Sequence, residues 1–375
     1  MKRVLILTAG YGEGHNSAAR ALQAAFNEYP DVSAELVDLF ALRAPRLNEV
    51  SRRGYLKLIN TAPGIWSSLY RWLDRSPRAP ALFRTLASHR RLLAEFIRTR
   101  QPTAIVSTYP VYAWLLNRLR ADGLEFCPHH TVITDAITIN SLWYRAPAAG
   151  WFVTDADSAA FLRERGVPAD KVHVSGFPVA LPFADRPPHL LPPMAPRRIL
   201  FMINTARGPA RAIVRELLKQ PYWSLTITAG RDEAFRRELQ ALAAKGPAKA
   251  EVLGWTNRIP DLLMTHHAVI SKAGGATTQE SINALCPMLI SQIVPGQEEG
   301  NYELLRRHEA GALATTPKEI VATLQRAFAD NGAVWQRWHD NLQRLARPNA
   351  ARAIATRVLQ NTASPIRTSS PPVEV

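Results

Sequence analysis

Short apolar runs alternate with polar turns and helical periods along most of this chain. Runs of this length are typical of strands buried on both faces, and their alternation with helices predicts a parallel, doubly wound sheet. The pattern occurs twice, which predicts two α/β units in series. The first series of predicted strands is 4–7, 34–37, 104–107, 130–133, 150–153 and 172–174, with a helix at 17–26. The second series is 198–203, 225–228, 251–253, 268–270 and 288–293, followed by helices over 335–359.

A proline-rich stretch separates the two series. Because proline interrupts both helices and sheets, 181–197 is interpreted as a linker. With 375 residues, the chain is also too long for one ordinary core. We therefore predict an N-terminal domain at 1–180 and a C-terminal domain at 198–345. A last helix at 346–362 is predicted to pack back on the first domain, and the Ser- and Pro-rich residues 363–375 are predicted to be disordered.

The composition is that of a globular protein, with 47% hydrophobic and 21% charged residues. Its apolar runs are strand-length and far too short to span a membrane. The first residues pass from a short apolar run into a Gly-rich turn, without the longer apolar region of a signal peptide. The two cysteines, Cys127 and Cys286, indicate neither a disulfide scaffold nor a metal cluster. These features predict a cytoplasmic protein.

The net charge of +15 is unevenly distributed. Residues 43–100 contain thirteen lysines or arginines and only three acids, with tryptophans and other aromatic residues among them. Cations beside tryptophan suit an anionic membrane surface, where each contributes roughly 1 kcal/mol. Nucleic acid is the competing polyanion, and ordinary solvated helices are the simplest alternative. Ordinary solvated helices do not account for the tryptophans in this region. We therefore favour a membrane surface as the partner and expect no nucleic-acid partner.

The segment 271–301 carries the strongest chemical signal, and reads SKAGGATTQESINALCPMLISQIVPGQEEGN. Gly274 and Gly275 lie between a predicted strand and a predicted helix that starts near Thr277. Glycines there let a ligand approach the backbone, and the free N–H groups of a helix N-terminus suit a diphosphate. Glu280, in the first turn, can accept both hydroxyls of a ribose. This segment therefore predicts a nucleotide-diphosphate site.

A second Gly-rich turn lies after the first strand, with Gly10, Gly12 and Gly14 followed by His15. At a helix N-terminus the positive potential disfavours an imidazolium. His15 is therefore predicted to be neutral near pH 7, which makes it a candidate general base. The alternative is a helix-start histidine that only hydrogen-bonds the loop.

The third constellation follows the strand 130–133, where open α/β sheets bind ligands. Asp135 can orient a base or an acceptor hydroxyl, or it can cap the next turn. Trp143 can meet a sugar or lipid, or it can be a packing residue. The residues alone do not decide between these readings.

Further candidates lie in the second half. Arg207, in the turn 205–208, can meet a phosphate, and Thr256 and Asn257 follow a strand and can contact a base. His266 and His267 are predicted to be structural, because their adjacent spacing does not suit helical metal ligation. The second half shows no Asp-x-Asp motif for a divalent ion on a diphosphate. We therefore expect no metal and no cofactor, and expect backbone N–H groups and side chains to meet the diphosphate charge.

Six motifs in order resemble one family. They are GYGEGHNSAA, TVITDAITINSLW, VSGFPV, GWTNRIPDLL, SKAGGATTQES and PGQEEGN. The chain resembles the monogalactosyldiacylglycerol synthases and processive diacylglycerol glucosyltransferases, relatives of the peptidoglycan N-acetylglucosaminyltransferase that makes lipid II. The similarity extends from residue 1 to about residue 359. It implies two Rossmann-like domains facing across a cleft, which is the B-type glycosyltransferase fold.

The resemblance also implies roles for individual residues. A UDP-hexose would bind the C-terminal domain, and a diacylglycerol-type lipid would bind the N-terminal one at the inner face of the cell membrane. His15 and Asp135 are the expected catalytic residues. The expected donor-binding residues are Arg207, Thr256, Asn257, Gly274, Gly275, Ala276, Thr277, Glu280, Gln297, Glu298 and Asn301. Those expected at the acceptor are Gly12, Gly14, Trp66, Asn140 and Trp143.

The chain departs from the family pattern at three places. Asn140 stands where family members usually have histidine, and the turn 204–208 is bulkier and more charged than the usual Gly-rich one. Leu285 stands where a glycine is common before Pro287. The donor site is thus the better preserved.

The expected reaction is an inverting, metal-independent transfer of a hexose from a UDP-sugar to a lipid hydroxyl. One alternative is a nucleotide-sugar 2-epimerase on the same fold, which needs no lipid. The other is a non-catalytic membrane- or nucleic-acid-binding relative.

Overall fold

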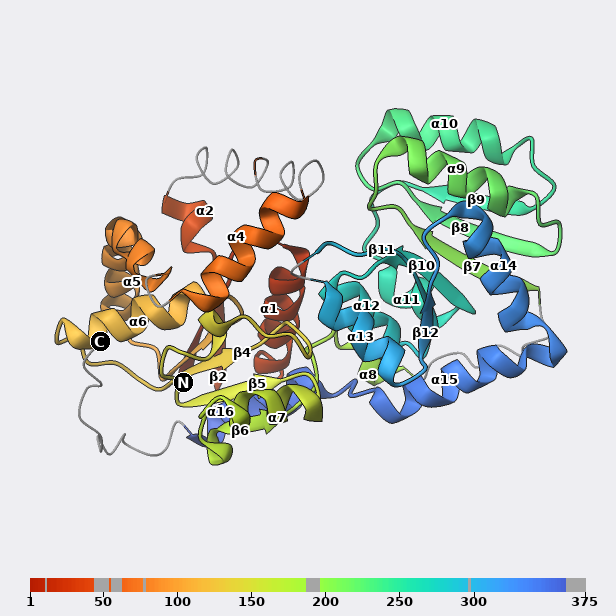
Figure 1. The fold of residues 1–375 in the computed structure, drawn as a ribbon. Coiled ribbons are helices and arrows are strands. Elements are labelled where there is room, and N and C mark those ends of the chain that lie inside the picture. Colours follow the sequence, from red (N-terminus) through yellow and green to blue (C-terminus); the bar gives the residue numbers. More distant parts are fainter. Residues whose placement is uncertain are drawn as a thin grey trace.

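The computed structural model describes residues 1–10, 12–43, 54, 63–76, 79–186, 196–295 and 298–361, of which residues 63, 66, 67, 79 and 80 are described by their backbone only. Two parallel six-stranded sheets, each with helices around it, make up the described chain (Figure 1). The protein is therefore of the α/β class, as the alternating pattern predicts.

The first sheet has the strand order β2-β1-β3-β4-β5-β6, and its neighbouring strands are all parallel. All six strands were predicted, and for three of them, β3, β5 and β6, the predicted first and last residues are those observed. Their bounds are β1 (Lys2–Leu7), β2 (Val32–Val37), β3 (Ala104–Ser107), β4 (His129–Val132), β5 (Gly150–Val153) and β6 (Val172–Val174).

The second sheet has the order β12-β11-β10-β7-β8-β9 and is also parallel. Its last strand along the chain, β12, was not predicted, because it has only three residues and begins with a glycine. The bounds are β7 (Arg197–Met202), β8 (Trp223–Thr228), β9 (Lys249–Leu253), β10 (Ala268–Lys272), β11 (Met288–Gln292) and β12 (Gly311–Leu313).

Helices connect the strands of both sheets. Those of the first half are α1 (Glu13–Phe26), α2 (Leu39–Arg43), α4 (Pro63–Arg75), α5 (Ala87–Arg100), α6 (Val111–Ala121) and α7 (Ala156–Glu164), with 3₁₀ turns η1 (Ala79–Leu86), η2 (Ser141–Trp143) and η3 (Ala169–Lys171). Those of the second half are α9 (Arg207–Leu218), α10 (Glu233–Ala243), α11 (Ile259–Met264), α12 (Gly275–Asn283), α13 (Glu299–Arg307), α14 (Pro317–Phe328), η4 (Asp330–Gly332), α15 (Ala333–Leu345) and α16 (Ala350–Asn361).

Several helix boundaries differ from the sequence prediction, among them those of α1 and of the predicted linker. Helix α1 begins at Glu13, four residues before the predicted start, so His15 lies in its first turn. A short helix, α8 (Pro182–Asp185), lies inside the predicted linker, since proline is well tolerated at the first position of a helix. Residues 187–195 of that linker and the predicted tail at 363–375 lie outside the described residues. The domain boundaries themselves stay predictions.

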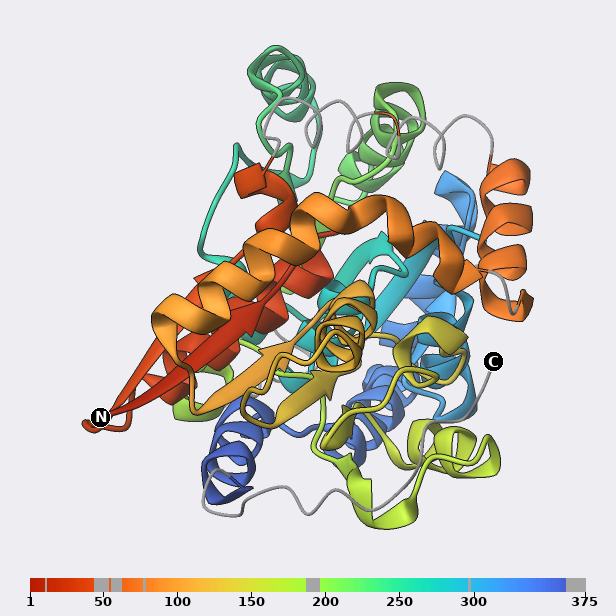
Figure 2. The ribbon, with the colours of Figure 1, turned by 90° about the vertical axis from the view of Figure 1, so that its left-hand side faces the viewer.

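The last helix, α16, returns to the first half of the chain and packs against α1. Its residues Ile354 and Val358 share one buried cluster with Leu22 of α1. At the surface, Arg352 of α16 donates to both Glu28 and Asp185. Figure 2 shows α16, drawn in blue, beside the strands of the first sheet.

Each sheet has one point where its strand order reverses direction. In the first sheet it lies between β1 and β3, and in the second between β7 and β10. The carboxyl ends of strands at such a point are where open α/β sheets bind ligands. The Gly-rich turn before α1 and the glycines before α12 both follow strands of these pairs. The fold therefore places both predicted motifs at a ligand-binding position.

Candidate active site

The N-terminus of α12 presents backbone donors that have no partner among the described residues. Strand β10 ends at Lys272, Gly274 caps the helix with an extended backbone, and Thr278 N donates to the Gly274 carbonyl over 2.9 Å. Because this is the first bond of the helix, the N–H groups of 275–277 have no partner within it. A diphosphate is the ligand that such donors and the helix dipole favour.

The loop after β11 is tied to this helix N-terminus by side chains. Glu298 forms an ion pair with the Lys272 ammonium, and its Oε2 accepts a hydrogen bond from Val294 N at 2.9 Å. Asn301 Nδ2 donates to the Ala273 carbonyl over 2.9 Å. Glu298 and Asn301 thereby lie close to Gly274, whereas Gln297 lies outside the described residues. Their roles in donor binding stay predictions.

Sequence reasoning missed two polar residues of this region. The first is Lys272, which pairs with Glu298. Its position directly before the AGG motif is the sequence signal that could have identified it. Asn204, after β7, donates to Ser271 Oγ over 2.8 Å and accepts from Lys272 N at 3.2 Å. Asn204 therefore links the two strands at the reversal point of the second sheet.

Glu280 is not in the first turn of the helix, as predicted, but in the second, because α12 begins at Gly275 rather than near Thr277. It lies on the side of α12 that faces α1. Ser17 Oγ of α1 donates to Glu280 Oε1 over 3.4 Å. Burial raises the pKa of Glu280 to about 7, while the Ser17 bond and the charge of Arg20 act in the opposite direction. The residue predicted to bind a ribose is thus half-buried at the seam between the two halves.

His15 lies in the first turn of α1 and is held by residues that follow strands β3 and β4. Its Nδ1 is 2.9 Å from Thr134 Oγ1, and Thr108 Oγ1 donates to the His15 carbonyl over 3.1 Å. The imidazole packs edge-on to the Tyr109 ring, with 5.2 Å between the centroids. Burial lowers the pKa of His15 to about 4, and a backbone hydrogen bond with Thr108 opposes this shift. The imidazole is therefore neutral at pH 7, and burial is the largest cause.

Asp135 follows β4 and is held by a tryptophan. Trp143 Nε1 donates to Asp135 Oδ2 over 2.8 Å. Burial raises the pKa of Asp135 to about 6, while hydrogen bonds from Trp143 and Tyr70 lower it. A carboxyl group of this kind changes its charge close to neutral pH, which is typical of functional sites.

Two residues expected at the acceptor are buried behind Asp135. Trp143 is 1% exposed, and its carbonyl accepts a hydrogen bond from Trp151 Nε1 at 3.1 Å. Asn140 caps η2, because its Oδ1 accepts from Leu142 N at 3.0 Å. In this structure both side chains shape the loop around Asp135. Trp66 lies on α4, and its side chain is outside the described residues.

Among the described residues, no hydrogen bond or ion pair joins three of the predicted donor residues to α12. Arg207 makes two hydrogen bonds of 2.8 Å to Asp232 at the surface. Thr256 Oγ1 accepts from Arg258 N at 3.1 Å, and Asn257 is exposed. Their roles stay predictions.

The two groups of site residues meet across one close seam. A Cβ on Gly14 would lie 3.8 Å from Ala276 N, and one on Gly275 would lie 3.3 Å from the Thr134 carbonyl oxygen. A Cβ on Gly300 would come within 2.0 Å of the Ala136 carbonyl oxygen. Glycines on α1, α12 and α13 thus allow the His15–Asp135 side to approach the Gly274–Glu280 side.

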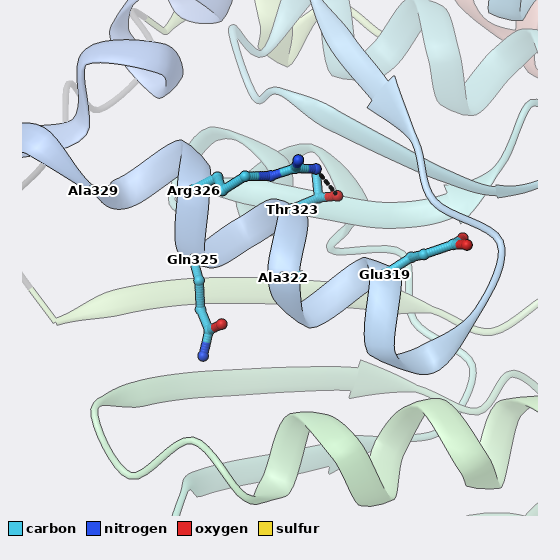
Figure 3. A pocket seen from close by; sticks show the side chains of 6 residues that line it. All are labelled: Glu319, Ala322, Thr323, Gln325, Arg326 and Ala329. Atoms are coloured by element: carbon cyan, nitrogen blue, oxygen red, sulfur yellow. Dashed lines mark hydrogen bonds between the residues drawn. The ribbon is translucent and has the colours of Figure 1, made fainter.

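Two surface hollows in the described part of the chain, one along α4 at 71–76 and one along α14, contain none of the predicted site residues. In the hollow along α14 (Figure 3), Arg326 donates to Thr323 over 3.2 Å while Glu319 and Gln325 point to different sides. Within the described ranges, no three His, Cys, Asp or Glu side chains converge as a metal site would require. No helix in the part of the chain that the structure describes is long and apolar enough to cross a membrane.

The comparisons with known proteins agree with the predicted resemblance. The family described as monogalactosyldiacylglycerol (MGDG) synthase matches residues 15–179. The processive diacylglycerol beta-glucosyltransferase of Bacillus subtilis (strain 168) is 25% identical over 373 residues, which is 96% of each chain. The resemblance to this family is confirmed.

Solved structures agree with the fold. MurG of Acinetobacter baumannii has a TM-score of 0.62 and 16% identity, covering 96% of this chain and 100% of MurG. The UDP-GlcNAc 2-epimerase of Neisseria meningitidis, solved with bound UDP-GlcNAc, has a TM-score of 0.59 and 12% identity, covering 96% of this chain and 100% of the epimerase. The chain has the B-type glycosyltransferase fold, as predicted. At these identities the likeness to solved structures concerns the fold alone.

Proposed function

We propose that this protein is an inverting, metal-independent glycosyltransferase that moves a hexose from a UDP-sugar to a diacylglycerol-type lipid at a membrane surface. The observation that carries the proposal is the seam described above. It brings the N–H groups at the start of α12 and Glu280 opposite the half-buried His15 imidazole and the half-buried Asp135 carboxyl group. The similarity to diacylglycerol glucosyltransferases over nearly the whole chain supports the same activity.

The donor binds on the second half of the chain. The ribose hydroxyls donate to Glu280, and the diphosphate accepts hydrogen bonds from the backbone at 274–277. These donors stabilise the leaving pyrophosphate without a metal, because they are fixed in place before the charge develops. Glu298 and Gln297 read the sugar hydroxyls, and Arg207, Thr256 and Asn257 complete the site around the phosphates and the base.

The acceptor binds on the first half. The lipid hydroxyl attacks the anomeric carbon, the bond from that carbon to the diphosphate oxygen breaks, and His15 or Asp135 takes the hydroxyl proton. A neutral imidazole at pH 7 can accept this proton. Asp135, with a pKa of about 6, is mostly ionised at pH 7 and can take the proton or orient the hydroxyl.

The membrane contact lies on the basic, aromatic region of the first half. Exposed apolar side chains lie on α2, α4 and η1, namely Leu42, Ile65, Leu69, Trp72 and Leu82. The arginines among them attract anionic lipid. The protein thus acts from the cytoplasm as a peripheral enzyme at the inner face of the cell membrane.

The direct test is to incubate the protein with a panel of radiolabelled UDP-hexoses and vesicles that contain diacylglycerol. A labelled glycolipid on thin-layer chromatography is the expected product. NMR of its anomeric proton should show the configuration opposite to that of the donor, and a chelator should leave the rate unchanged. Absence of any glycolipid with every sugar would refute the proposal, and retention of configuration or loss of activity with chelator would refute its finer points.

The 2-epimerase alternative shares the fold, as the Neisseria meningitidis enzyme illustrates. It requires conversion of free UDP-N-acetylglucosamine without any lipid, which the same panel can detect in the absence of vesicles. A non-catalytic relative would partition onto vesicles, or shift an oligonucleotide, but produce no sugar product.

A further inference from the structure

Helix α4 has two chemically different faces. Ile65, Leu69 and Trp72 are spaced four and three residues apart, so they share one side of the helix. Their side chains are 65%, 41% and 46% exposed. Arg71 and Arg75 are exposed beside this side, which therefore suits an anionic lipid surface. We refer to these five residues as the outer face of α4.

The opposite side of α4 is tied to the loop that carries Asp135 and Trp143. Asp74 Oδ1 accepts a hydrogen bond from Ser141 N at 2.6 Å, and the Asp74 carbonyl accepts from Ser141 Oγ at 2.5 Å. One turn earlier, the Tyr70 carbonyl accepts from Asn140 Nδ2 at 3.4 Å. These bonds attach the inner side of α4 to η2 and its cap.

The side chain of Tyr70 reaches further, to Asp135 itself. A hydrogen bond from Tyr70 acts on the Asp135 carboxylate together with the one from Trp143 Nε1. Two donors from two separate elements therefore restrict how this carboxyl group can turn. Trp143 is a fixed donor, because it is buried and held by Trp151. Tyr70 comes from a helix whose other side faces outward.

We propose that Tyr70 is a positioning residue that couples the lipid-facing helix α4 to the Asp135 carboxylate. The inference rests on the proposed function and adds a link to it. When the outer face of α4 lies on the lipid, the helix holds Tyr70, and Tyr70 holds Asp135 toward the acceptor hydroxyl. A helix that leaves the lipid surface takes this donor with it.

The substitution Tyr70→Phe tests the link, because it removes only the hydroxyl group. We expect kcat on diacylglycerol vesicles to fall by roughly 10- to 100-fold, the usual range for a hydrogen bond to a charged group. Vesicle partitioning and UDP affinity should not change. Tyr222→Phe is the matched control, because Tyr222 is 82% exposed in the donor half. Wild-type kcat in Tyr70→Phe would overturn the proposal.

The pH profile separates positioning from a general structural role. Asp135 receives hydrogen bonds from Tyr70 on α4 and Trp143 on η2, while Asp74 of α4 is engaged by Ser141. His15 of α1, whose ring centroid is 5.9 Å from that of Trp143, is neutral at these pH values. Because the Tyr70 bond lowers the pKa of Asp135, its loss raises that pKa. The acidic limb of kcat should therefore move to higher pH in Tyr70→Phe, and an unmoved limb counts against the link.

An outer-face variant completes the test. The double substitution Leu69→Ser with Trp72→Ala should weaken partitioning onto anionic vesicles and lower turnover there, while a soluble short-chain diacylglycerol restores turnover. The same soluble acceptor should not restore Tyr70→Phe. Full rescue of Tyr70→Phe would mean that Tyr70 serves only membrane binding, which contradicts the proposal.

Folding and the parent proposal are checked separately. Retained UDP binding and an unchanged thermal transition show that Tyr70→Phe is folded. If it does not fold, Tyr70→Trp serves instead, because tryptophan keeps an N–H donor. Tyr70→Trp should then retain more activity than Tyr70→Leu. Equal loss in those two variants overturns the link. Failure of the wild-type protein to transfer any sugar would instead refute the proposed function.

Discussion

The two sides of the seam use different parts of the polypeptide for chemistry. On the first half, the candidate groups are the side chains of His15 and Asp135, whose pKa values are shifted by burial to about 4 and about 6. On the second half, the main candidates are backbone N–H groups at the start of α12, with Glu280 beside them. Both sides lie where strand order reverses in a parallel sheet, so position alone does not explain the difference.

The comparison teaches which kind of substitution each side tolerates. A backbone site depends on the path of the chain and on the absence of a Cβ at Gly275 and Gly300. A side-chain site depends on each individual group and on the packing that sets its pKa. Conservative changes of side chains should therefore affect the first half more than the second, and added bulk at glycines should affect the second half more than the first.

The largest expected effect is on the first half, at His15. His15→Ala should lower transfer by about 10²- to 10⁴-fold, the usual contribution of a general base, and should leave UDP affinity unchanged. Single-turnover rates and UDP titration measure the two quantities. His308→Ala is the control, because His308 is exposed on the donor half. Retained turnover in His15→Ala would assign the proton transfer to Asp135.

On the second half, the side-chain contribution comes from Glu280. Glu280→Ala should raise the dissociation constant of UDP by roughly 10- to 100-fold, because it removes hydrogen bonds to a charged acceptor. Calorimetric titration with UDP is the measurement, and Glu251→Ala, an exposed residue of β9, is the control. Unchanged affinity would show that the donor side uses its backbone alone.

The close approach of the two sides can be disturbed at Gly300. In Gly300→Ala the new methyl group would collide with the Ala136 carbonyl oxygen, so the halves must shift apart. We expect a loss of about 1–3 kcal/mol in unfolding free energy, as is usual for overpacking. Gly208→Ala should show no such loss, because a Cβ there meets nothing within 4 Å. Thermal unfolding and small-angle scattering would detect the change, and identical curves would show that the seam is loose in solution.

The smallest expected effect is the pH dependence of UDP binding. With a pKa of about 7, Glu280 is ionised above that pH and protonated below it. Only the ionised carboxylate accepts both ribose hydroxyls, so UDP affinity should fall about threefold between about pH 7.5 and about pH 6.5. Glu280→Gln should lack this component. The same slope in Glu280→Gln would assign the titration to another group.

Much of this arrangement could be predicted from local sequence. Continuous apolar runs in the first sheet gave strands that end within two residues of their predicted positions, because a strand buried on both faces needs apolar residues throughout. The glycines at 274 and 275 indicated a helix N-terminus open to a ligand, and α12 begins there. Short elements with weak signals, such as β12 and α8, could not be predicted in the same way.

The contacts of the candidate residues could not be predicted from their motifs. The family resemblance implied acceptor roles for Trp143 and Asn140, yet both are buried around Asp135. Lys272 pairs with Glu298, which lies 26 positions further along the chain. On the inner side of α4, Asp74 contacts Ser141 in the loop after β4, which lies 67 positions further along the chain.

The sequence by itself determined two parallel sheets, the place of the Gly-rich turns at strand ends and the family that the chain resembles. These properties depend on residues close together in the chain, where periodicity and turn chemistry act. Only the tertiary structure decided that Glu280 faces Ser17, that His15 is neutral through burial and that Tyr70 reaches Asp135. Those properties depend on desolvation and on contacts between distant segments, which exist only after both halves have packed against each other.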